Sequence, residues 1–176
     1  MGAEWGAMPP ELIAAQVTTG DGGASLAAAA AAYQGLVAML TSEGAAMAAT
    51  SAGTAASGWE GLGGTAMVTT AMPYVAALEG LSAWVEQAGA AAASILDAYA
   101  TTRASLIPVP ACELNRTQFA AAVAAGIFGW PEAVFLQGQY QEYWTQNASL
   151  AGGYEAFVTG VLAALATPPP PAPLTA

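Results

Sequence analysis

The sequence contains no histidine or lysine, and its only basic residues are Arg103 and Arg116. Proteins that bind nucleic acid use Lys and Arg to neutralise phosphates. A chain with a formal net charge of −10 is therefore excluded from that class. Binding to an anionic lipid surface is disfavoured for the same reason. We expect any partner to be apolar or basic.

The chain also lacks most of the residues that proteins use for nucleophilic catalysis and for metal binding. Cys112 is the only cysteine, so no intrachain disulfide forms and no Cys-His pair is possible. The twelve acidic residues are scattered, and Glu79 and Glu86 lie two helical turns apart, which is typical of a solvated face. The segment from Gly20 to Ser25 does not fit the dinucleotide-binding glycine pattern. We expect no enzyme activity, no cofactor and no metal site.

Charged residues make up only 8% of the chain, whereas a soluble domain carries about a quarter. Much of the surface must therefore face a core, a partner or a membrane. The best apolar run, from Phe119 to Phe128, ends at Gly129, so we expect no membrane-spanning helix. The N-terminal residues lack a basic segment, and no classical signal peptide is expected.

Alanine-rich segments with few β-branched runs predict an all-α fold, an elongated antiparallel bundle of about five helices. Pro10 suits a first helical turn, and Glu11 is favoured there by the helix dipole. Pro73 predicts a kink or a late start in the third helix. The predicted helices cover residues 10–18, 24–57, 64–106, 113–125 and 132–166. Residues 1–166 are assigned to one domain, and the proline-rich residues 167–176 to an extended, disordered tail.

Two of the predicted helices carry apolar residues at alternating spacings of four and three, as in a coiled-coil contact. A two-helix hairpin of this length cannot bury two faces alone, which indicates an obligate helical partner. The predicted partner surface comprises Leu26, Tyr33, Val37, Leu40 and Met47 in the second helix, with Leu78, Leu81, Val85, Ile95 and Tyr99 in the third.

The turn from Gly126 to Pro131 is unusually apolar for a connection between helices. Either this turn folds back into the core, or it forms an exposed tip that binds another protein. In the helix that follows, the predicted buried face comprises Phe135, Tyr140, Tyr143, Trp144, Leu150, Tyr154 and Val158.

Seven short motifs in order give the chain a family resemblance. They are Met8-Pro9-Pro10-Glu11, Ser25-Leu26-Ala27-Ala28-Ala29-Ala30, Trp59-Glu60-Gly61, Met72-Pro73-Tyr74-Val75, Asn115-Arg116, Ile127-Phe128-Gly129 and Tyr140-x-Glu142-x-Trp144. From Trp5 to Leu165 the chain resembles the mycobacterial PPE proteins, for which Pro9, Pro10 and Glu11 form the signature.

The resemblance implies a role in type VII (ESX) secretion. A PPE domain pairs with a PE protein, a helical hairpin, to form a four-helix bundle. An EspG chaperone grips the tip, here Gly126, Ile127, Phe128, Gly129 and Trp130. Trp59 and Gly61 would form one half of an export signal whose other half, Tyr-x-x-x-Asp/Glu, belongs to the PE partner. No tyrosine of this chain has Asp or Glu four residues later.

The chain departs from the family pattern at the tip, where Gly126 replaces a usual asparagine, and at Asn147, which replaces a common aspartate. The implied function is that of a secreted, non-enzymatic protein, held in the cytoplasm by its chaperone before export and acting at the cell surface or on the host. The alternative is a membrane-associated protein of the outer envelope that aids small-solute uptake.

Overall fold

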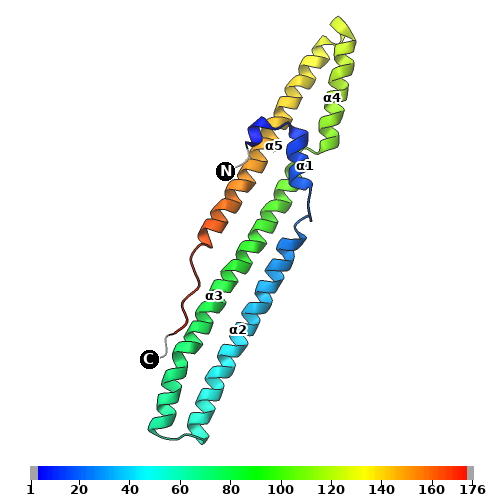
Figure 1. Cartoon of the computed structure of the whole chain (residues 1–176). Coiled ribbons are helices and arrows are strands. Elements are labelled where there is room, and N and C mark those ends of the chain that lie inside the picture. Colours follow the sequence, from blue (N-terminus) through cyan, green and yellow to red (C-terminus); the bar gives the residue numbers. More distant parts are fainter. Residues whose placement is uncertain (1–3, 174–176) are drawn as a thin grey trace. The chain divides into compact units, whose positions relative to one another are not determined.

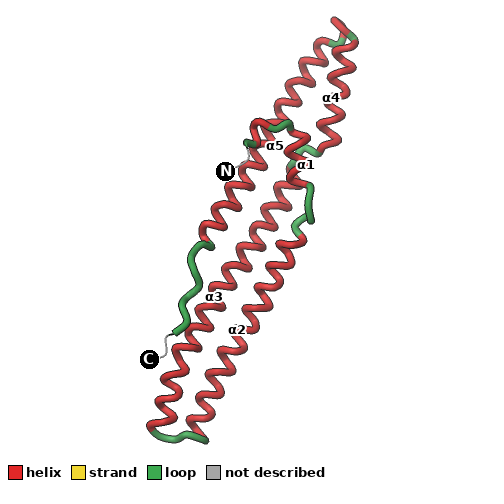
Figure 2. The backbone as a smooth tube through the Cα atoms, in the orientation of Figure 1, coloured by secondary structure: helices red, strands yellow, loops and turns green. Residues whose placement is uncertain are grey.

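The computed structural model describes residues 4–173 and shows only helices and connecting loops in that range (Figures 1 and 2). The all-α prediction is confirmed. The elements are the 3₁₀ turn η1 (Trp5–Ala7), α1 (Pro10–Thr18), α2 (Ala24–Ser57), α3 (Leu62–Ser105), α4 (Val109–Ala124), the 3₁₀ turn η2 (Gly126–Phe128) and α5 (Trp130–Ala164). The outermost residues of the predicted domain and tail, 1–3 and 174–176, lie outside the described range.

The chain divides into two compact units. Unit 1 contains residues 1–24 and 95–161, and unit 2 contains residues 25–94 and 162–176. The long helix α3 contributes its first part to unit 2 and its last turns to unit 1.

Unit 1 packs α1 against α4, α5 and the end of α3. Its central side chains are Ile13 and Cys112, both fully buried, together with Leu106 and Ala151. A second cluster joins α4 to α5 through Ala122, Ala133 and Leu136, with Phe119 against it. Both clusters combine small residues with larger apolar ones.

Unit 2 is built on α2 and the first part of α3, which run side by side in opposite directions (Figure 1). The turn between them permits this because Gly61 has a φ of 84°, which a residue with a side chain adopts only at a cost. A Cβ added at Gly44 of α2 would meet the Leu78 side chain of α3 at 3.8 Å. Thr41 and Ser82 share a 3.3 Å hydrogen bond across the same pair.

The prolines act differently from the prediction at two places. The helix predicted from residue 113 begins at Val109, because Pro110 falls in the first turn of α4, where its missing N–H costs nothing. The third helix begins at Leu62 and includes Pro73, so the proline does not mark a late start of that helix.

The search for uninterrupted apolar runs, which gave no membrane-spanning candidate, missed α2. By length and composition alone α2 is apolar enough to span a membrane, and none of its most apolar 18-residue window is buried within the chain. Such a search overlooks α2 because its apolar residues are interrupted by polar ones. The high mean hydropathy of α2 comes largely from its many alanines. Core helices of soluble proteins meet the same criterion, so the finding shows only that α2 is long, apolar and exposed.

Candidate functional site

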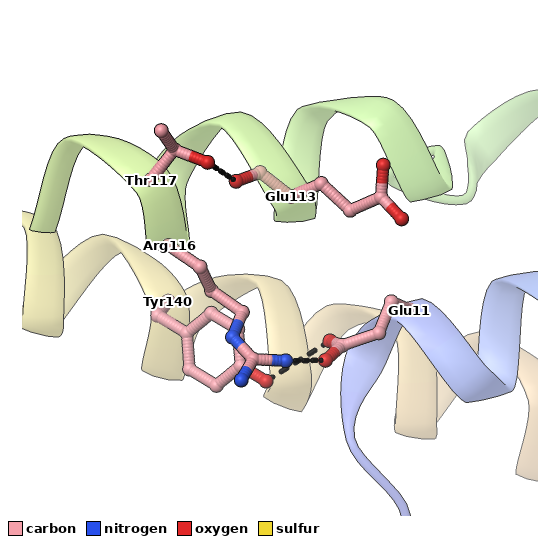
Figure 3. A network of polar contacts seen from close by, with 5 residues as sticks. All are labelled: Glu11, Glu113, Arg116, Thr117 and Tyr140. Carbon is pink, nitrogen blue, oxygen red and sulfur yellow. Dashed lines mark hydrogen bonds and ion pairs between the residues drawn. The ribbon is translucent and has the colours of Figure 1, made fainter. Parts of the chain in front are cut away.

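The Pro-Pro-Glu motif lies at the centre of unit 1. Pro9 occupies the N-cap position of α1, and Pro10, the first helical residue, is fully buried. Glu11 points toward α4 and α5, where one carboxylate oxygen, Oε1, lies 2.6 Å from Nη1 of Arg116. The other, Oε2, accepts a 2.9 Å hydrogen bond from the Tyr140 hydroxyl (Figure 3). The motif therefore connects three helices.

This network changes the titration of its members. Burial raises the pKa of Glu11, but a backbone hydrogen bond and the contacts with Tyr140 and Arg116 outweigh it, so the net pKa lies below the ordinary 4.5. Burial and the hydrogen bond to Glu11 raise the pKa of Tyr140 to about 12. Glu11 is therefore held as an anion and Tyr140 as a neutral donor at neutral pH.

Asn147 lies behind the motif and is fully buried. Its Nδ2 donates to the carbonyl oxygens of Pro10 and Ile107, both at 3.0 Å. Its Oδ1 accepts a 2.8 Å bond from the Ile107 N–H. Asn147 thus joins α1, the α3–α4 connection and α5, and it needs an amide because two of its bonds require a donor.

A second buried amide, Asn115, holds α4 to α5. Its Nδ2 donates to the Leu136 carbonyl at 3.1 Å and to Gln139 Oε1 at 2.8 Å. The family resemblance marked Asn115 and Asn147 only as motif positions, and their roles were missed. The sequence feature that could have predicted these roles is an asparagine inside an apolar helix, because a buried amide must find hydrogen-bond partners.

Cys112 is fully buried beside this network, and burial followed by the charge of Glu11 raises the pKa of its thiol. A thiol in that state is a poor nucleophile. Among the described residues no group of three His, Cys, Asp or Glu side chains could hold a metal ion. The polar contacts of Glu11 and Asn147 tie α4 and α5 to α1.

The turn between α4 and α5 is an exposed apolar tip. Ile127 is 84% exposed, Phe128 93% and Trp130 66%. The sequence left open whether these residues fold inward, and they do not. Gly126 has a φ of 63°, and a Cβ at Gly129 would overlap the carbonyl oxygen of Ala122. The two glycines therefore allow a turn tight enough to project all three side chains.

The apolar surface continues from the tip along the α4–α5 hairpin. Phe119, Val123, Trp130, Ala133, Val134 and Gln137 line a groove of about 220 Å³. Phe135, predicted to be buried, is 62% exposed. That prediction was wrong because this part of α5 packs on α4 through Ala133 and Leu136, and Phe135 is not part of that cluster.

The residues predicted to bind a partner fall into two groups. Val85 and Ile95 are buried within the chain, and the ring of Tyr99 lies 6.1 Å from that of Tyr154. These three are therefore covered by the chain's own packing. The others retain exposure, and Met47 is 38% exposed. The half-buried members are Leu26, Tyr33, Val37, Leu40, Leu78 and Leu81.

Within unit 2 a groove of about 320 Å³ runs between α2 and α3. Tyr33, Gln34 and Val37 line it from α2, and Val85, Glu86, Gly89, Ala90 and Ala93 from α3. The floor is made of small residues, and a Cβ at Gly89 would come within 3.1 Å of the Tyr33 Cβ. Another helix could approach closely here, because small residues leave space for its side chains.

The Trp59-x-Gly61 turn closes the other end of unit 2. Trp59 is 61% exposed and Leu62 92% exposed. Trp59 also lines an apolar groove of about 620 Å³ with Met47, Met67 and Tyr74 among its neighbours. The turn presents an aromatic side chain at the surface.

Comparison with known proteins identifies the family of the chain. A model of the PPE family matches residues 4–166. The protein PPE29 of Mycobacterium tuberculosis, named as an uncharacterized family member, is 36% identical over 86% of this chain and 36% of its own length. Transporter PPE51 of the same species is 37% identical over 96% of this chain and 46% of its own length. The chain thus spans less than half of each relative, and it belongs to the PPE family.

Proposed function

We propose that the chain is a non-enzymatic binding module that pairs with a PE protein and is exported as that pair by a type VII secretion system. The observation that supports this is the exposure of α2. Of its 34 residues only Gly44 is buried, although the helix is strongly apolar. Such a surface is unfavourable in water and favours a covering partner.

The groove of unit 2 is where we place the partner. Apart from Tyr33, Gln34 and Glu86 its lining is small and apolar, which suits a helical hairpin packed against α2 and α3. Two further helices on this pair would make a four-helix bundle, the arrangement that family membership implies.

A charge in the groove tests this placement. Ala90→Glu puts a carboxylate among the lining residues and should abolish co-purification with the PE partner, because an unpaired charge would be buried at the interface. Ala121→Glu makes the same change on an exposed position of α4 and should leave the pair intact. Retention of the partner by Ala90→Glu would show that the groove is not the interface.

The exposed tip is proposed to bind the EspG chaperone in the cytoplasm before export. Its three large side chains are exposed on a turn held by α4–α5 packing, and a neighbouring apolar groove extends the surface. Clustered, exposed aromatic side chains on a rigid support are typical of protein-binding hot spots. After export the pair would act at the cell surface or on the host.

A second function is favoured by the apolarity of α2 and by the name of PPE51 as a transporter. In this alternative the chain associates with the outer envelope and aids the uptake of small solutes. Alkaline carbonate extraction separates the two functions. An integral component stays with the membrane, whereas an exported dimer is released.

A further inference from the structure

The proline-rich segment after α5 lies along α3 within unit 2 (Figures 1 and 2). The indole Nε1 of Trp84 donates a 2.9 Å hydrogen bond to the carbonyl oxygen of Thr167. Three residues further on, Pro170 packs at Gly80, where an added Cβ would lie 3.2 Å from the proline Cγ. Two separate contacts therefore hold this segment against one helix.

The two α3 residues form a matched pair. Gly80 and Trp84 are four residues apart, so they lie on the same face of the helix, one turn from each other. Gly80 leaves a notch in that face, and the indole ring of Trp84 stands beside it with a single donor. An aromatic wall with a hydrogen-bond donor next to a shallow groove is how proteins recognise proline-rich ligands.

The segment has the complementary chemistry. Residues 168–171 are four consecutive prolines, which have no backbone N–H and offer only carbonyl acceptors. Such a run favours the extended polyproline II conformation, so little conformational entropy is lost when it docks. The Trp84 indole is a donor only. It donates to the carbonyl oxygen of Thr167, the residue immediately before the four prolines.

We propose that the Gly80–Trp84 face of α3 is a polyproline-recognition surface, and that residues 167–173 occupy it as an intramolecular strap. The strap covers a side of α3 distinct from the partner groove. Glu86, which lines that groove, follows Trp84 by two residues and therefore lies about 160° from it around the helix. The strap thus blocks one side of α3 to other proteins and leaves the groove open.

Paramagnetic broadening tests the strap in the full chain, purified as the soluble pair with its PE partner because the chain alone is expected to aggregate or partly unfold. A spin label on Ala172→Cys, an exposed position, should broaden the NMR signal of the Trp84 indole N–H, which is assigned by its loss in Trp84→Phe. Cys112 is fully buried, and the unsubstituted chain provides the control for labelling there. Absence of broadening would overturn the proposal.

Two variants and a control test whether the Gly80–Trp84 face recognises the prolines or whether the segment merely lies near it. Gly80→Leu fills the notch, and replacement of residues 168–171 by Gly-Ser repeats removes the prolines. Each should restore the Trp84 signal. Gly53→Leu adds the same side chain on α2, where a Cβ meets no atom within 4 Å, and should leave the broadening unchanged.

A peptide of residues 167–173 should then shift the Trp84 indole signal when added to the chain whose prolines are replaced. It should have no effect when Gly80→Leu is also present. If broadening persists in both variants, or if the peptide shifts nothing, the face does not recognise proline.

Discussion

The Nδ2 of Asn147 donates a 3.0 Å hydrogen bond to the carbonyl oxygen of Pro10, and the two residues are 137 positions apart in the sequence. The central proline of the Pro-Pro-Glu motif is thereby tied to the middle of α5, while Glu11 contacts Arg116 and Tyr140. The motif acts as a brace for the helices that carry the exposed tip. Its role is structural, whereas the binding surface that we propose is the exposed tip.

Asn147→Asp should be strongly destabilising. It removes both donors, to Pro10 and to Ile107, and buries a carboxylate with no cation among its hydrogen-bond partners, at a cost of about 3 kcal/mol or more. Ser149→Asp adds the same charge on an exposed position of α5 and should cost less than about 0.5 kcal/mol. Urea unfolding of the purified pair measures both. Equal midpoints for the two variants would contradict the role assigned to Asn147.

Glu11→Gln should reduce the pH dependence of stability on the acid side. The folded-state pKa of Glu11 lies below its ordinary 4.5, so its contribution is complete above that pH and is lost as the pH falls through the folded value. We expect a loss of about 1 to 2 kcal/mol at pH 7, since Arg116 is 64% exposed and its ion pair is screened.

Glu113→Gln is the matched control for Glu11, because its carboxylate points away from the network (Figure 3). Thermal unfolding at pH 7 and at pH 3 should show a smaller difference for Glu11→Gln than for Glu113→Gln. If the two variants lose the same stability on acidification, the network does not depend on the Glu11 charge.

Gly129→Ala and Gly138→Ala should change stability in opposite directions. A Cβ at Gly129 overlaps the Ala122 carbonyl, a backbone atom that cannot move aside, so the turn must open at a cost of about 1 to 3 kcal/mol. A Cβ at Gly138, inside α5, would meet no atom within 4 Å, and alanine should stabilise the helix by about 0.5 to 1 kcal/mol. Denaturant midpoints of the two variants measure this. A stable Gly129→Ala would mean that the tight turn is not needed.

Phe128→Asp should abolish chaperone binding while the PE pair remains intact. The side chain is 93% exposed, so the substitution removes apolar contact area without disturbing the fold. Gln118→Asp on the exposed side of α4 carries the same charge and should still bind. Pull-down with the EspG chaperone distinguishes them. Binding by Phe128→Asp would show that the tip is not the chaperone site.

The sequence predicted the helices better than their contacts. The ends of α1 and α2 matched the predicted bounds, since glycine and proline marked them clearly. Pro110 misled the prediction because the same residue ends one helix and suits the first turn of the next. The exposure of Phe128 and Phe135 depends on which helices lie nearby. The bonds of Asn147 join residues far apart in sequence, which local patterns do not reveal.

The central claim is that α2 and α3 require a PE partner, and expression of the chain with and without candidate PE proteins tests it most directly. The measurement is the yield of soluble protein and the cooperativity of its thermal unfolding. We predict aggregation or partial unfolding of the chain alone, and a soluble one-to-one complex that unfolds cooperatively with the right partner. A soluble chain that unfolds cooperatively as a monomer without any partner would contradict the account.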